Sequence, residues 1–128
     1  MDITYDDVDK YLKGVKEAIR KGDYRIDRHE RRKANVMLYK DYVIDENKSK
    51  EIILDLQVQN FCARFPNEHE GFEHEMLYVF GAEVKLLQRF GDKEESVPLY
   101  IKFNQLENKY VIVISFHKQE YPLKYYFN

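Results

Sequence analysis

The sequence predicts an α+β fold in which N-terminal helices pack on a C-terminal curved antiparallel sheet. Up to about residue 60, the apolar residues recur mainly at spacings of three and four, which is typical of amphipathic helices. Beyond residue 75 they alternate or form short runs that end at turn-forming residues, which is typical of β-strands. A chain of 128 residues with helices first and strands last is expected to form one domain over residues 1–128.

The first third of the chain predicts one long helix and a short strand. Apolar residues form a stripe along residues 4–21, and Gly22 supplies a stop after it. Thr4 and Asp7 resemble a capping pair at the start of this helix. Residues 23–27 alternate polar and apolar, so we expect a short strand there.

Two further helices and a loop are expected before the sheet. A charged helix is predicted to begin at residue 27, with residues 27–33 as its first turns and Val36, Met37 and Tyr39 on its apolar side. A third helix is predicted over residues 47–56, with Asn47 as its N-cap. Residues 66–74 are polar and contain Pro and Gly, which favours a loop.

The sheet is predicted from runs with a period of two. Strands are expected over residues 76–80, 99–103 and 110–116, and residues 84–90 can add a fourth. Short turns between neighbouring strands favour an antiparallel meander. Residues 111–114 are apolar on both faces and are therefore the best candidate for a central strand, with helices covering one side.

Composition limits the possible functions and locations. A net charge of −2 provides no overall attraction to a polyanion, so any nucleic-acid contact needs a local basic patch. Cys62 is the only cysteine, which excludes an intrachain disulfide and favours a reducing compartment. The acidic N-terminus does not resemble a signal peptide, and no apolar run is long enough to span a membrane. We therefore expect a cytoplasmic protein that does not contact membranes.

The end of the last predicted strand carries the most reactive group of side chains. His117 follows the buried run directly, where a side chain is held rigidly but reaches solvent, and Lys118 comes next. An imidazole with an ordinary pKa near 6.5 can accept or donate a proton at neutral pH. The alternative is a strand-end histidine with no chemical task.

A second pair of candidates lies on the neighbouring strand. Tyr100 and Lys102 are two residues apart, so they project from the same face of the sheet. Together they could bind a phosphate and donate a proton to a leaving oxygen. The alternative is a solvated cross-strand pair.

The C-terminal tail interleaves aromatic and basic residues. Tyr121, Lys124 and Tyr125 follow His117 closely, and Pro122 stiffens the turn between them. Rings that stack on bases and lysines that contact phosphates are used in binding single-stranded RNA. The alternative, which is compatible with the first, is that these rings close the core.

Other groups of polar residues point less clearly to a function. The basic run over residues 25–33 is interrupted by acids, which favours a solvated face. His69 and His74 have no zinc-binding spacing, so no metal site is expected. No phosphate-binding loop, nucleophile elbow or dinucleotide fingerprint is present in the sequence, and no cofactor is expected. Cys62 has no local support as a nucleophile and is expected in the core.

Three C-terminal segments, over residues 99–103, 111–117 and 120–125, together resemble the signature of the MqsR-family toxins of type II toxin-antitoxin systems. That family is similar in fold to the RelE-type toxins, which have a curved antiparallel sheet packed by N-terminal helices. The resemblance implies a metal-independent mRNA endoribonuclease. It also implies a partner antitoxin, often a repressor with a helix-turn-helix DNA-binding region.

The resemblance also suggests roles for individual residues. Tyr100 matches the family's strand tyrosine, and His117 stands where the best-known member has a lysine. Under this interpretation His117 is the general acid or base and Tyr100 is its partner. The remaining candidates stabilise the transition state or bind substrate: Lys102 and Lys124 in the first role, and Tyr121, Tyr125, Lys118 and Arg64 in the second.

Two alternatives remain open. Two further active-site positions of the best-known member fall near Ala63 and Leu77, which cannot perform that chemistry, and Arg64 is the nearest cation. These positions favour a binding module that retains the antitoxin surface and has lost the nuclease. The other alternative is a nuclease that acts only on translating ribosomes.

Overall fold

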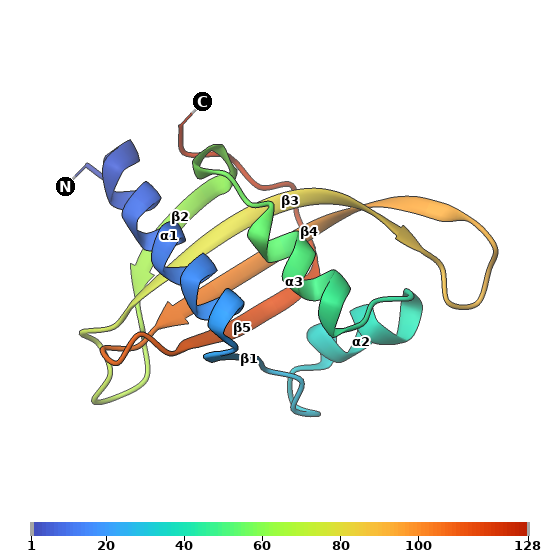
Figure 1. Ribbon diagram of the computed structural model, residues 1–128, viewed down its shortest axis with the longest axis horizontal. Coiled ribbons are helices and arrows are strands. Elements are labelled where there is room, and N and C mark those ends of the chain that lie inside the picture. Colours follow the sequence, from blue (N-terminus) through green and yellow to red (C-terminus); the bar gives the residue numbers. More distant parts are fainter. Residues whose placement is uncertain (1, 128) are drawn as a thin grey trace.

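The structure is a computed structural model that describes residues 2–127 and contains helices followed by a five-stranded sheet (Figure 1). In chain order the elements are α1 (Tyr5–Lys21), β1 (Tyr24–Ile26), α2 (Lys33–Asp41), α3 (Glu46–Leu54), the 3-10 helix η1 (Val58–Asn60), β2 (Phe61–Pro66), β3 (Met76–Leu87), β4 (Glu94–Gln105) and β5 (Val111–Lys118). The predicted α+β class, with helices before the sheet, is confirmed.

The strands lie in the order β1-β5-β4-β3-β2. The strands from β2 to β5 form an antiparallel meander, which was predicted without β2, whereas β1 pairs with β5 in parallel and makes the sheet mixed. The middle position belongs to β4 rather than to β5. β5 is nevertheless an internal strand because β1 covers its outer edge over residues 111–113.

Helix α1 forms as its local sequence predicts. Thr4 Oγ1 accepts a hydrogen bond from the Asp7 amide at 3.0 Å, and the Asp7 carboxylate accepts one from the Thr4 amide at 3.0 Å. Gly22 ends the helix in the left-handed conformation, with a φ of 81°, which glycine adopts without steric cost. The stripe that α1 buries consists of Val8, Leu12, Val15, Ala18 and Ile19.

The starts of α2 and α3 differ from the prediction. Residues 27–32 form a loop because the Asp27 carboxylate accepts a hydrogen bond from the His29 amide at 3.1 Å and binds Arg32 at 3.3 Å. Such bonds between a side chain and nearby groups compete with helix formation. Asp45, not Asn47, caps α3, since its carboxylate accepts from the Lys48 amide at 2.8 Å.

The first strands of the meander were only partly predicted. β2 was not predicted, because its sequence, Phe61–Pro66, does not alternate cleanly between apolar and polar residues. β3, Met76–Leu87, is one continuous strand that joins the predicted run 76–80 to residues 84–87 of the predicted run 84–90. The expected break between them does not occur, because residues 81–83 pair with β4 in unbroken register.

Helices α1, α2 and α3 lie on one face of the sheet (Figure 1). The core lies between these two layers, and its largest fully buried side chains are Phe61, Phe80, Phe103 and Phe116. None of the helices within residues 2–127 combines the length and the apolar character needed to cross a membrane.

The opposite face of the sheet carries no helix within the described residues, and we call it the open face. The C-terminal tail, residues 119–127, runs from the end of β5 to β2, where the Tyr126 amide donates to the Phe61 carbonyl at 2.9 Å. The Tyr126 hydroxyl also accepts a hydrogen bond from the Ile3 amide at 3.1 Å. The first and last segments of the described chain therefore lie close together (Figure 1).

Candidate functional site

Alternation along β4 separates the polar candidates from the core. Tyr100, Lys102 and Asn104 project to the open face, because successive residues of a strand point to opposite sides. The residues between and before them enter the core: Val97, Leu99, Ile101 and Phe103. The prediction that Tyr100 and Lys102 share one face is confirmed.

The neighbouring strand β5 brings His117 next to Tyr100. The antiparallel register places Tyr100 opposite His117, and Lys102 opposite Ser115. The rings of Tyr100 and His117 are stacked, with centroids 5.1 Å apart and planes 9° from parallel. Residues directly opposite in an antiparallel pair point to the same face, so this pair lies beside Lys102.

A β-bulge puts His117 on the open face. Phe103 pairs with Val113, whereas Lys102 pairs with Ser115, so Ile114 is an extra residue in β5. Without the bulge, strict alternation from the buried Val113 would turn His117 toward the core. The bulge shifts the alternation by one residue, so that Phe116 enters the core and His117 does not.

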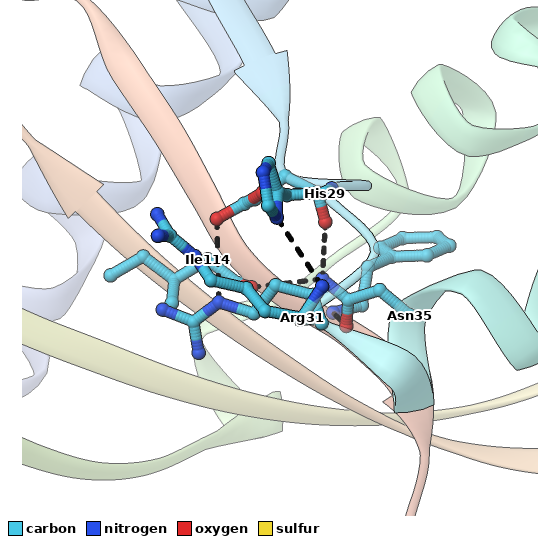
Figure 2. A network of polar contacts seen from close by, with 7 residues as sticks. His29, Arg31, Asn35 and Ile114 are labelled. Atoms are coloured by element: carbon cyan, nitrogen blue, oxygen red, sulfur yellow. Dashed lines mark hydrogen bonds and ion pairs between the residues drawn. The ribbon is translucent and has the colours of Figure 1, made fainter.

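Asn35 of α2 holds this bulge in place (Figure 2). Its Nδ2 donates to the Ile114 carbonyl at 2.9 Å and to the Asp27 carbonyl at 2.6 Å. Its Oδ1 accepts a hydrogen bond from the Phe116 amide at 2.9 Å. The Asn35 side chain is only 2% exposed. Strand β1 is too short to pair with this part of β5, so Asn35 supplies the hydrogen bonds that these backbone groups would otherwise lack. Sequence patterns did not single out Asn35, which has the polarity of a surface residue.

The stacked pair lines a hollow of about 340 Å³, which we call the histidine hollow. Its lining residues are Tyr100, Lys102, Ser115, His117, Glu120, Tyr121 and Leu123. The sheet supplies the first four residues and the tail supplies the others. Four of the candidates named from the sequence therefore meet here, together with Ser115 and Glu120, which were not predicted.

Hydrogen bonding determines which nitrogen of His117 is free. Nδ1 lies 2.8 Å from the carbonyl oxygen of Lys118. A carbonyl oxygen can only accept, so Nδ1 carries the proton in this hydrogen bond. In the neutral ring, Nε2 then has the lone pair and is the nitrogen that can accept a proton from a ligand.

Burial changes the acidity of the two neighbours of His117. Burial lowers the pKa of the Lys102 ammonium group, and the nearby charge of Arg32 lowers it further. Burial is also the main cause that raises the pKa of the Tyr100 phenol, with Cys62 as a smaller cause. Tyr100 therefore keeps its proton at neutral pH, and Lys102 is a poorly solvated cation that gains from the approach of an anion.

Two predicted substrate contacts lie elsewhere. Lys118 Nζ contacts the Tyr42 hydroxyl at 3.3 Å and Glu95 at 3.7 Å, outside the histidine hollow. Arg64 lies 3.5 Å from the hydroxyl of Tyr78, which belongs to the core beneath the helices. The structure does not bring either cation to the stacked pair.

The remaining tail candidates lie beside the hollow. Lys124 is exposed and is not among the lining residues of the histidine hollow. The Tyr125 hydroxyl lies against Gly81 of β3, and partial burial raises the pKa of its phenol. Tyr121 is 77% exposed, so its ring forms the rim of the hollow rather than part of the core.

Gly81 allows the tail to lie on β3. A Cβ built there would lie 3.0 Å from Leu123 Cδ1 and 3.1 Å from the Tyr125 hydroxyl oxygen. We expect Gly81→Val to displace the tail and to lower the unfolding free energy by about 1–2 kcal/mol, because an overpacked contact must move. Limited proteolysis with trypsin should then cut faster after Lys124. Ser96→Val at an exposed position of β4 is the control, and an unchanged rate for the Gly81 variant would contradict the tail packing.

Cys62 is partly buried in β2 and is expected to react slowly with thiol reagents. Burial raises the pKa of its thiol to about 11, compared with an ordinary value of 9.0. At neutral pH this difference leaves about a hundredfold less of the nucleophilic thiolate. Alkylation by iodoacetamide, followed by mass spectrometry, should be slower than for free cysteine by at least that factor. A rate equal to that of free cysteine would show that Cys62 is not shielded.

A second hollow, of about 430 Å³, adjoins the first on the open face, and we call it the arginine hollow. Lys102 lines both hollows. Arg25 and Arg32 belong to the basic run that was interpreted as a solvated face, but both line this hollow. The sequence feature that could have identified Arg25 is the alternation of residues 23–27. This alternation places Arg25 on the same face of the sheet as its β5 partner Ile112.

No cluster of three or more His, Cys, Asp or Glu side chains within residues 2–127 has the geometry to hold a metal ion. His69 lines the arginine hollow, and His74 lies in the loop between β2 and β3.

Comparisons of the chain with models of protein families, with curated proteins and with solved structures found no match.

Proposed function

We propose that the protein is a metal-independent endoribonuclease that cleaves mRNA at the histidine hollow and inhibits translation and growth as a toxin. The observation that supports this most directly is the stacked pair of Tyr100 and His117 beside Lys102. The pair lies on a face of the sheet that the helices leave uncovered. The resemblance of the C-terminal segments to the MqsR-family toxins supports the same function.

The proposed reaction begins at His117. Neutral Nε2 removes the proton from a ribose 2'-hydroxyl, and the 2'-oxygen forms a bond to the adjacent phosphorus. The bond from phosphorus to the 5'-oxygen breaks, and the Tyr100 hydroxyl donates its proton to that oxygen. The products are a 2',3'-cyclic phosphate and a 5'-hydroxyl end. Proton exchange with solvent then returns both side chains to their starting forms.

Lys102 and Tyr121 complete this proposal. The Lys102 ammonium group lies where it can stabilise the extra negative charge of the phosphorane, a contribution of about 2–4 kcal/mol by comparison with other oxyanion donors. Its partial burial strengthens this interaction because water screens it less. The exposed ring of Tyr121 can stack on a base of single-stranded RNA.

The reaction can be tested directly with purified protein. A 5'-labelled single-stranded RNA incubated with the protein in EDTA should yield fragments that end in 2',3'-cyclic phosphate. Cleavage that appears only with translating ribosomes would identify a ribosome-dependent nuclease instead. RNA that stays intact with EDTA, with Mg²⁺ and with translating ribosomes would reject the nuclease.

The proposed physiological partner is an antitoxin protein, with a helix-turn-helix DNA-binding region, that neutralises the enzyme. Expression of the protein alone should then arrest growth of the host. Co-expression of the product of the neighbouring gene should relieve the arrest. Harmless expression would contradict the toxin function even if the purified protein cleaved RNA.

A second candidate function is a binding module that has lost the nuclease. Ala63 and Leu77 favour it, because β2 and β3 add these apolar side chains to the open face near Lys102. A module of this kind would bind the neighbouring gene product and leave RNA intact. The EDTA cleavage assay therefore separates the two functions.

A further inference from the structure

The arginine hollow is built from segments that are distant in the sequence. Strand β1, the loop after it, the four strands of the meander and the loop between β2 and β3 contribute its walls and floor. The residues on which the inference depends are Arg25, Arg32, Phe65, Lys102, Asn104 and Ile112. Because Lys102 lines this hollow and the histidine hollow, a ligand that spans both would contact Lys102 at its middle.

The cations of the arginine hollow exceed its acids. Arg25 is exposed and forms no ion pair within the described residues, whereas Arg32 pairs with Asp27 at 3.3 Å. With Lys102, the lining has three cations against the carboxylates of Asp27 and Glu68. An anion that binds between Arg25 and Lys102 would contact two positive charges that form no ion pair with the acids of the hollow. Phosphate of a nucleic-acid backbone is such an anion.

Asn104 adds an unpaired acceptor to this hollow. Its side chain is 4% exposed, and Nδ2 donates to Glu75 Oε1 at 2.9 Å. A carboxylate only accepts, so the amide nitrogen faces Glu75 and Oδ1 faces away from it. Within residues 2–127, Oδ1 accepts no hydrogen bond, and such a buried acceptor costs free energy until a donor reaches it.

The partner that Asn104 lacks must be a hydrogen-bond donor. A phosphate diester has no proton to donate at neutral pH, so it does not satisfy Asn104. The edges of nucleobases carry N–H groups that do. Phe65 and Ile112 give the hollow apolar walls against which the face of a base can pack. Oδ1 is buried, so a side-chain movement must accompany the contact.

We propose that the arginine hollow binds one nucleotide of a single-stranded RNA, with its base against Asn104 and its phosphate between Arg25 and Lys102. The assignment to RNA, and to the nucleotide next to the cleaved bond, rests on the proposed function. The hollow would then hold the substrate in register, while His117 and Tyr100 act on the neighbouring linkage.

Binding can be measured without cleavage by a probe whose 2'-hydroxyls are blocked. We expect a fluorescein-labelled 2'-O-methyl RNA hexamer to bind Arg25→Gln about 5- to 10-fold more weakly than wild type in fluorescence anisotropy. The dependence of log K on log salt should also become shallower by about 0.7, as expected when one phosphate contact to a single strand is lost. Arg20→Gln, which removes an exposed arginine from α1, is the matched control and should bind as wild type.

The base contact has a test of its own. Removal of the base at one position of the hexamer should weaken binding to wild type. The same removal should weaken binding to Asn104→Leu by less, because that variant has already lost the contact with the base. Equal losses for both proteins would reject the role of Asn104. If Asn104→Leu does not fold, Asn104→Ser, which removes the amide but keeps a small side chain, replaces it.

The outcomes separate this inference from the proposed function. If wild type binds the hexamer with the expected dependence on Arg25 but cleaves no RNA, the nuclease is rejected and the nucleotide site stands. If wild type cleaves RNA while Arg25→Gln binds and cleaves as wild type does, the arginine hollow is not a substrate site. If the protein is a nuclease and the arginine hollow is a substrate site, Arg25→Gln should raise KM and leave kcat unchanged.

Discussion

His117→Ala is expected to cleave RNA about 10²- to 10⁴-fold more slowly than wild type, which is the usual contribution of a general acid or base. The substitution removes Nε2, the nitrogen that the hydrogen bond from Nδ1 to the Lys118 carbonyl leaves free. Tyr100 and Lys102 remain, so substrate binding should change much less than kcat. The measurement is single-turnover cleavage of a labelled RNA at saturating protein.

The control for this prediction is His74→Ala, which removes an exposed imidazole from the loop between β2 and β3. That variant should cleave as fast as wild type. Thermal unfolding of both variants should show that neither loses its fold, since His117 is only partly buried. If His117→Ala retains the wild-type rate, then His117 has no part in the chemistry.

Asn35→Ala is expected to lower the unfolding free energy by about 3 kcal/mol. The change leaves the partly buried carbonyls of Asp27 and Ile114 and the buried amide of Phe116 without their hydrogen-bond partner. Each unsatisfied buried group costs about 1–3 kcal/mol, and some relaxation toward water reduces the sum. For a chain of this length, the melting temperature should fall by about 10 °C.

Met37→Ala is the matched control, because Met37 lies on the same helix and is 51% exposed. Its unfolding free energy should stay within about 0.5 kcal/mol of wild type. Thermal unfolding and urea titration measure both variants. A loss below 1 kcal/mol for Asn35→Ala would show that the bulge in β5 does not depend on this side chain.

The Asn35 variant should also have a functional defect. At temperatures where it remains folded, a loosened bulge would let His117 leave its stacked position against Tyr100. RNA cleavage should then fall more than binding of the uncleavable hexamer. This comparison distinguishes a positioning role for Asn35 from a general loss of folded protein.

Local signals were sufficient where the interactions themselves are local. The capping pair Thr4 and Asp7 and the stop at Gly22 predicted α1, because these residues contact groups within one turn of the helix. The prediction placed the start of α2 too early, since the loop bonds of Asp27 to His29 and Arg32 could not be distinguished from helical periodicity. β2 was missed because pairing with β3, not its own pattern, makes it a strand.

The candidate site was predicted in part for the same reason. Tyr100 and Lys102 share a face by simple alternation, which holds along any regular strand. The positions of Lys118 and Arg64 depend on long-range contacts with Glu95 and Tyr78, so their separation from the hollow was not visible in the sequence. Asn104 and Arg25 became candidates only when the register of neighbouring strands put them in one hollow.

The sequence by itself determined the α+β class and the order of helices before the sheet, and it supplied the candidate residues near the C-terminus. The tertiary structure decided on which face His117 lies. Alternation from Val113 would have buried it, and the bulge at Ile114 that exposes it is held by Asn35, 79 residues earlier in the chain. A period of two is a property of neighbouring residues, whereas a bulge depends on hydrogen bonds that only the folded chain brings together.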